Sequence, residues 1–559
     1  MASHQPEVPV AQVPRRPSRR LVTSIGVAVL AAMLAAACGD DDSEPSAGAA
    51  TTAPSTQSSE EGATSSSATE EDEIDRNGIM RVDLDLTNAN SHILDPGQLL
   101  ISPATMLHHM IYDTLFRVKP DGTWIPSLAT SARIVDGSTV EVVLREGVTF
   151  TDGTPVNAEA FKFSIERAVA GASGTLTVEM RLIDEITAVD EHTVRIHTSQ
   201  PVAGVIYDRL PYGDFLLVSP TAVNNGVDLL TNPVGAGPFM LDSLTPNQSL
   251  KLKKNPGYWD ADSIKLAGVE FVSMQAGTAQ LNAARSNTVD VLGAGTTSIT
   301  YDQGKELASS GWMVDNQPTD NLTVTSAICK NRPPFDDVRV RQAVSYAVDR
   351  EALNQALYDG QGEVVVGLFR KGSPLHDESL AEYTRHDPDK ARQLLEEAGA
   401  TNLTFDILVS ATTQRTGEIL QSQLAEVGIT ANLVTQTGTS QFFPDAKEAP
   451  VNIFNYERTG LLKVTRLLTP GSIANVCRYD DPDVNALVSE IASLDPESPE
   501  AVAAWKELQE LIVSEALNWY YVFGVRPHVY NPERLGNVEY LLNSQGIEHI
   551  DFYNVYVKK

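Results

Sequence analysis

Residues 333–350 read PPFDDVRVRQAVSYAVDR, and this stretch predicts an amphipathic helix that packs against a buried core. Asp336 follows two prolines and a phenylalanine, and it suits the N-cap because its carboxylate accepts hydrogen bonds from free backbone N–H groups. Gly360 is the expected stop. Arg339 and Arg341 are expected to pair with neighbouring carboxylates on a solvated face. Apolar residues recur at helical spacing and would form the buried face: Val340, Ala343, Val344, Ala347 and Val348.

Downstream of this helix, strand and helix patterns alternate. A second helix is predicted from Asp387, which is followed by the N1 proline Pro388, to Gly399. Alternating units of this kind build parallel sheets with helices on both faces, so we expect an α/β fold. A chain of 559 residues also predicts more than one lobe. The segments that carry these patterns are STVEVVLREG (138–147), LTFDILVS (403–410), TGEILQSQLAEVG (416–428) and ITANLVTQ (429–436).

The N-terminal residues 1–37 have the pattern of a signal peptide. Four arginines precede an apolar run over 21–37, and small residues lead to Cys38. An uncleaved anchor helix is the alternative. Residues 38–77 are rich in Ser, Thr and acidic residues, which predicts a disordered tether because such a segment cannot bury enough apolar surface to fold. The net charge of −31 excludes bulk electrostatic binding to nucleic acid or to anionic lipid.

The sequence around Cys38, LAAACG over 34–39, resembles a bacterial lipobox. In lipoproteins of that kind the cysteine thiol carries a diacylglycerol and becomes the mature N-terminus. Leu34 stands four residues before Cys38, where the usual box has leucine three before. The resemblance implies an exported protein that is lipid-anchored at the outer face of the cytoplasmic membrane. Residues 18–22 also resemble a twin-arginine signal, and the choice between that route and the general secretory route stays open.

Five blocks of the remaining chain carry the next resemblance: residues 111–131, 144–161, 232–241 (NPVGAGPFML), 255–259 (NPGYW) and 333–350. With these blocks in this order, the rest of the chain resembles the bacterial extracellular solute-binding proteins of family 5, the peptide and nickel importer type. Ala160 departs from the family pattern, which commonly has aspartate there. Each block also has a plain structural interpretation as a turn or a close crossing, so we expect the blocks to be scaffold.

The resemblance implies a two-lobed periplasmic-binding-protein-like fold with an extra subdomain and a ligand cleft between the lobes. Closure of the lobes around a solute would be a hinge motion. By the same resemblance, lobe I comprises residues 78–117, 233–328 and 522–559, the extra subdomain comprises 118–232, and lobe II comprises 329–521.

The sequence indicates the identity of the ligand less clearly than it indicates the fold. Peptide-binding members carry an acidic residue in lobe II that pairs with the peptide α-amino group, and the matching position here is Thr459. Because an unpaired buried ammonium is costly, a pocket without that acid should not favour a free peptide N-terminus. Arg458 makes an anion conceivable, although it could equally be a surface residue. A peptide, a blocked peptide, a sugar or another small organic molecule stay open.

Further ligand-contact candidates follow from their positions in the family fold. They combine polar and aromatic groups of the kind that converge in solute pockets. Each has an alternative interpretation as a core or rim residue. The full candidate set is Ser91, His92, Cys329, Lys330, Asn331, Asn455, Tyr456, Arg458, Asn475, Tyr521 and Phe523.

Cys329 and Cys477 are the two cysteines outside the targeting segment. In an exported protein they could form a disulfide, since thiols oxidise outside the cytoplasm. The alternative is that each is a small buried hydrophobic residue. By the family fold both would lie near the cleft-facing edge of lobe II.

We expect a binding protein rather than an enzyme, because neither a GxSxG elbow nor a GxxxxGK[ST] loop occurs in the sequence. No cofactor and no metal site are expected, since the sequence has no CxxC or HExxH motif. The expected partners are a small-molecule or peptide ligand, the permease and ATPase subunits of an ABC importer, and the membrane through the lipid anchor. A surface receptor or sensor that uses the same fold is the alternative.

Overall fold

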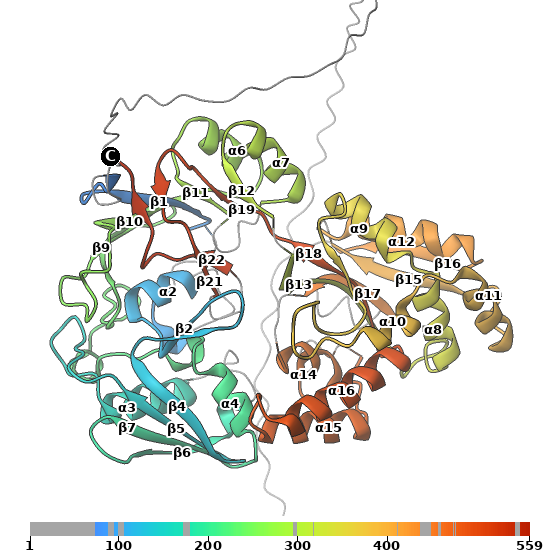
Figure 1. Ribbon diagram of the computed structural model, residues 1–559, viewed down its shortest axis with the longest axis horizontal. Coiled ribbons are helices and arrows are strands. Elements are labelled where there is room, and N and C mark those ends of the chain that lie inside the picture. Colours follow the sequence, from blue (N-terminus) through green and yellow to red (C-terminus); the bar gives the residue numbers. More distant parts are fainter. Residues whose placement is uncertain are drawn as a thin grey trace, which may run out of the picture. The chain divides into compact units, whose positions relative to one another are not determined.

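The computed structural model describes residues 73–87, 94–98, 105–171, 179–293, 299–316, 318–410, 412–436, 449–456, 460–472, 475, 477–542 and 548–559. The predicted signal peptide and Cys38 therefore lie outside the described residues, as does all of the predicted tether except residues 73–77. Two large sheets, each with its own hydrophobic core, organise the described chain (Figure 1).

Lobe I is built on a seven-stranded sheet. The strands β1, β10 and β11 are parallel to one another, and β19 is antiparallel to β11 and β12. Its apolar core lies between this sheet, helix α2 (Thr105–Tyr112) and the C-terminal segment. In spatial order the sheet contains β12 (Met313–Asp315), β19 (His528–Tyr530), β11 (Val291–Leu292), β1 (Ile79–Leu84), β10 (Gly268–Ser273), β9 (Ser249–Lys254) and β8 (Phe239–Thr245).

Lobe II is built on a six-stranded sheet covered on both faces. Helices α8 (Val338–Ala347), α9 (Arg350–Tyr358), α11 (Pro388–Glu397) and α12 (Gln414–Glu426) pack on one face. Helices α14 (Leu462–Leu468), α15 (Pro482–Ser493) and α16 (Pro499–Ser514) pack on the other (Figure 1). In spatial order the strands are β14 (Glu363–Val364), β18 (Asn518–Val525), β13 (Pro318–Ile328), β17 (Val451–Tyr456), β15 (Thr404–Val409) and β16 (Thr430–Thr435).

The extra subdomain, defined here by a four-stranded sheet and two helices, forms a third core. Its sheet has the order β4 (Ala129–Asp136), β5 (Thr139–Leu144), β7 (Thr193–Thr198) and β6 (Ile183–Ala188). Its helices are α3 (Ala158–Gly171) and α4 (Ala203–Arg209), and α5 (Pro220–Asn224) follows them. Smaller sheets join β22 (Glu548–Ile550), β21 (Tyr540–Leu542), β2 (Phe116–Val118) and β3 (Trp124–Pro126), and β20 (Leu535–Gly536) with β23 (Tyr556–Val557). The other helices are α6 (Thr278–Arg285), α7 (Tyr301–Ser309) and α10 (Ala381–Thr384).

The helix predicted from residues 333–350 forms, but three of its details differ. Asp337, not Asp336, is the N-cap, and its side chain accepts from the backbone N–H of Arg339. Asp349 starts a second helix, so the expected single helix is divided into α8 and α9. Arg341 is buried, not solvated, and its guanidinium donates to carbonyl oxygens of Phe335 and Glu515. Arg339 does pair with a neighbouring carboxylate, that of Asp337.

The other predicted elements of lobe II are confirmed. Helix α11 begins after the N-cap Asp387, and Gly399 follows it with a positive φ. Strands β15 and β16 are parallel and flank α12 in sequence, with Thr404 opposite Thr430. The sheet also assigns β13 and β18 to lobe II. The chain therefore crosses between the lobes at 315–318 and 525–528, rather than at the predicted boundaries 328/329 and 521/522.

Candidate ligand-binding site

The direction of the strands locates the candidate solute site. In lobe I the strand β12 ends at Asp315 and the chain crosses to lobe II, and it returns at His528, which lies opposite Asp315 in the sheet. Strands β1, β10 and β11 run in the same direction as β12, so their carboxyl ends share the edge from which the chain crosses. Solutes of open α/β sheets bind outside such carboxyl ends.

Lobe II presents the same kind of edge to the crossings. Strand β13 enters from the crossing at Pro318, opposite Val525 at the end of β18. Strands β15, β16 and β17 run antiparallel to β13, so their carboxyl ends also point toward the crossings. We call this shared region, defined by the carboxyl ends of the parallel strands in both lobes, the crossover edge.

Two predicted site residues lie toward the crossover edge. Asn455 and Tyr456 end β17, where Tyr456 stands opposite Thr323 of β13. Asn455 is exposed. Arg458 follows directly, but it lies outside the described residues, as do Ser91 and His92. The structure therefore brings the end of β17 to the expected region and leaves those three predictions untested.

Four predicted contacts lie at the opposite end of lobe II. Strand β13 has 11 residues, so Cys329 is roughly 35 Å along the strand from the crossing. The Lys330 ammonium is buried over the ring of Tyr479 and donates to Leu517 O. Burial, followed by the charge of Arg341, lowers the pKa of Lys330 well below its usual value. These groups stabilise the far end of the sheet, away from the crossover edge, and their assignment as solute contacts stays a prediction.

The same far end contains the disulfide. Cys329 and Cys477 are joined with an S–S distance of 2.00 Å and a Cα–Cα distance of 4.9 Å. Asn331 Nδ2 donates to the carbonyl oxygen of Cys477 at 2.8 Å. Asn475 Nδ2 donates to the carbonyl oxygens of Thr469 and Tyr479. Asn331 and Asn475 thus fix the loop that carries Cys477, and the cysteines lie away from the crossover edge rather than beside it.

The two aromatic candidates are core residues. The Tyr521 hydroxyl lies 2.8 Å from Ser326 Oγ, and burial raises the pKa of Tyr521 to about 12. Phe523 is 1 % exposed, and the Lys463 ammonium lies 4.9 Å from its ring centroid. Both side chains help to pack the six-stranded sheet, in line with their alternative interpretation as core residues, and a contact of either with a solute stays a prediction.

Two groups at the crossover edge were not predicted. Among the described residues, Asn316 Oδ1 and Thr323 Oγ1 are buried and have no hydrogen-bond partner. Buried polar atoms nearly always have one, so both atoms can accept a hydrogen bond from a bound molecule or from water. Thr323 and Thr325 alternate with apolar residues along β13, and this period-two pattern is the signal that could have identified Thr323.

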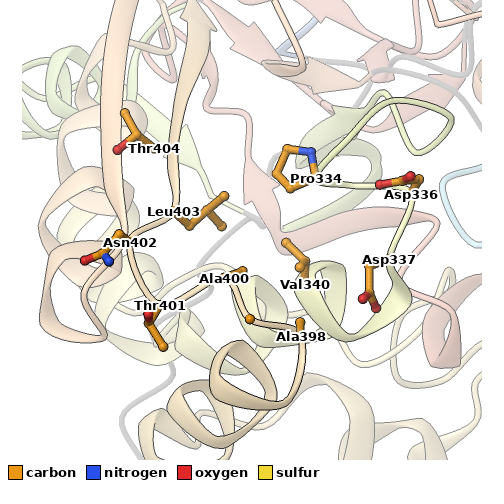
Figure 2. A pocket seen from close by; sticks show the side chains of 11 residues that line it. Pro334, Asp336, Asp337, Val340, Ala398, Ala400, Thr401, Asn402, Leu403 and Thr404 are labelled. Atoms are coloured by element: carbon orange, nitrogen blue, oxygen red, sulfur yellow. The ribbon is translucent and has the colours of Figure 1, made fainter.

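Pockets also occur away from the crossover edge. One is lined by Pro334, Asp336, Asp337 and Val340 with residues 398–404, at the start of β15 and so opposite its carboxyl end (Figure 2). Another, beside His528 and His549 in lobe I, has a volume of about 30 Å³. That is room for one or two water molecules, not for a solute. Among the described residues no cluster of His, Cys, Asp or Glu could hold a metal ion.

Comparison with known families agrees with this topology. Residues 123–460 match the model of the bacterial extracellular solute-binding proteins, family 5. The chain belongs to this family. Glutathione-binding protein GsiB of Shigella flexneri serotype 5b is 30 % identical over 362 residues, which cover 62 % of this chain and 68 % of that protein.

Solved structures share the two-lobed α/β fold of this family 5 protein. The ABC transporter substrate-binding protein CtaP of Listeria monocytogenes has a TM-score of 0.73 at 19 % identity, covering 86 % of this chain and 100 % of that one. The periplasmic binding protein DppA of Helicobacter pylori, in complex with the peptide STSA, has a TM-score of 0.69 at 20 % identity. That match covers 88 % of this chain and 99 % of DppA.

Proposed function

We propose that this family 5 protein is the lipid-anchored substrate-binding component of an ABC importer. It captures one small solute at the crossover edge and delivers it to permease and ATPase subunits, without catalysing a reaction. The observation that carries the proposal is that both sheets direct their carboxyl ends to the two crossings. The family match and the glutathione-binding relative support the same role.

The anchor is part of the proposal because LAAACG over 34–39 resembles a lipobox. No helix among the described residues combines the length and the apolar character that a membrane crossing needs. Cys38 carries the lipid, and the acidic segment that follows tethers the folded lobes.

The solute class follows from the residue at position 459. Thr459 cannot neutralise an ammonium, so the solute is a peptide-like or other small molecule without a required free α-amino group. Isothermal titration with trialanine and with N-acetyl-trialanine tests this, because the two probes differ at that amino group. We expect the acetylated peptide to bind at least as tightly as the free one. Binding of the free peptide about tenfold more tightly or better, about 1.4 kcal/mol, would contradict the assignment.

Glutathione is the third probe in this titration, given the ligand in the name of the relative. The matched site control is Thr323→Val, which keeps the side-chain shape and removes the hydroxyl. If the crossover edge is the site, this variant weakens whichever probe binds by up to about tenfold, the effect of losing one buried hydrogen bond.

A further inference from the structure

The extra subdomain is firmly attached to lobe I. The buried Asp113 carboxylate accepts hydrogen bonds from Ser127 Oγ at 2.9 Å, from Tyr258 OH at 2.8 Å and from Tyr553 OH at 2.9 Å. Tyr258 and Tyr553 belong to the lobe I core. Of these three bonds, the one from Ser127 joins the subdomain to Asp113 of lobe I. Because hydrogen bonds to a buried carboxylate are strong, we infer that the subdomain moves with lobe I.

Helix α4 of this subdomain nevertheless meets lobe II. A Cβ placed on Gly204 would lie 2.2 Å from Leu494 O, 3.0 Å from Ala492 O and 3.2 Å from Ile491 O, at the C-terminal end of α15. Real Cβ atoms do not approach backbone oxygens this closely, so only glycine permits the contact. The helix thus touches the end of α15 with its backbone.

Neighbouring residues extend the contact on both sides of Gly204. Val205 is 5 % exposed and belongs to the lobe II cluster formed by α14, α15 and α16. Val202 is half-buried and packs against both that cluster and the subdomain core. A Cβ on Gly460, just before α14, would lie 3.3 Å from Asp208 Oδ2. Val202 and Val205 thus form the apolar part of the contact, and the carboxylate of Asp208 lies beside it at Gly460.

We propose that α4 forms a contact, here called the latch, that is made only in the closed state. The Gly204–Val205 face of α4 docks on the end of α15 when the lobes close, and the two surfaces separate when the lobes open. The apolar part of the contact suits this role, because burial of Val202 and Val205 against lobe II stabilises the closed state. The proposal gives the extra subdomain a task in lobe closure. It rests on the two-lobed fold and not on the identity of the solute.

The test measures lobe separation in the absence of solute. Nitroxide labels at Val189→Cys in the subdomain and Val434→Cys in lobe II report the distance by electron–electron double resonance. Both positions are exposed, at 46 % and 43 %. The background is the full chain with Cys38→Ser, since the other two cysteines are joined to each other. Gly204→Leu should shift the open-to-closed ratio toward longer distances by about tenfold or more, the effect of losing one buried valine-sized contact.

Gly171→Leu is the matched control, because a Cβ there has a single neighbour at 3.9 Å, Gly97 O. It should leave the distances unchanged. Val205→Ala should shift the label distances in the same direction as Gly204→Leu, but by a smaller amount. If Gly204→Leu does not melt cooperatively, the distances in Val205→Ala provide the test of the latch. Wild-type distances in Val205→Ala and in a folded Gly204→Leu, or an equal shift in Gly171→Leu, would overturn the latch.

Discussion

His549 is held in its neutral form by its surroundings. Its ring is 6 % exposed, stacks on Phe552 at 5.5 Å, and donates from Nδ1 to Ile550 O at 2.8 Å. Burial is the largest influence and lowers the pKa of His549 to about 4. The neighbouring His109 is also buried, and its pKa is lowered well below the usual value for the same reason. At neutral pH both rings are therefore uncharged.

This predicts a loss of stability in acid. The pKa of His549 rises from about 4 in the folded chain to about 6.5 when the chain unfolds. Its contribution is therefore complete above pH 6.5 and is lost as the pH falls toward 4, by at most about 3 kcal/mol. Denaturant melts of His549→Phe should show a shallower fall in the free energy of unfolding over this window, while the exposed-residue control His197→Gln follows the wild type. Parallel curves for His549→Phe and wild type would refute the assignment.

At the scale of elements, the disulfide joins the end of β13 to the loop between α14 and α15. It closes a long loop, with a sequence separation of 148 residues. In the chain-entropy model such a cross-link contributes about 5 kcal/mol. We expect denatured, unreduced protein that has lost its lipid to contain no free thiol from Cys329 or Cys477. Two free thiols per monomer would show that the bond does not form in the exported protein.

The sequence predicted elements better than it predicted contacts. The α11 cap and the β15–α12–β16 unit follow from local rules, because an Asp–Pro cap, a C-terminal glycine and helical periodicity act within a few residues. The division between α8 and α9 was missed, since Val348 continues the apolar face while Asp349 caps a new helix. The roles of Lys330 and Phe523 depend on which end of a strand faces the crossings and which side chains cover the sheet. The register and the direction of strand pairing determine these two roles, and a local sequence pattern does not reveal either the register or the direction.

At the scale of the whole molecule, two crossings connect two sheets whose carboxyl ends share one edge. On the proposed function, a solute bound at the crossover edge contacts both lobes, so its binding free energy stabilises closure. The subdomain, joined to lobe I by the bond from Ser127 to Asp113 and touching lobe II through α4, adds a contact that does not involve the solute. Closure is therefore stabilised at two surfaces, the crossover edge with its solute and the contact of α4 with lobe II.

Mass spectrometry of the protein extracted in detergent from its producing bacterium tests the central claim most directly. The denatured mass should equal a chain that begins at Cys38 plus its acyl groups, and Cys38→Ser should lack them. The native mass should exceed the denatured one by a single solute of about a few hundred daltons, the size that a closed pocket of this kind encloses. An unmodified chain that still begins at Met1, with equal native and denatured masses, would contradict the account.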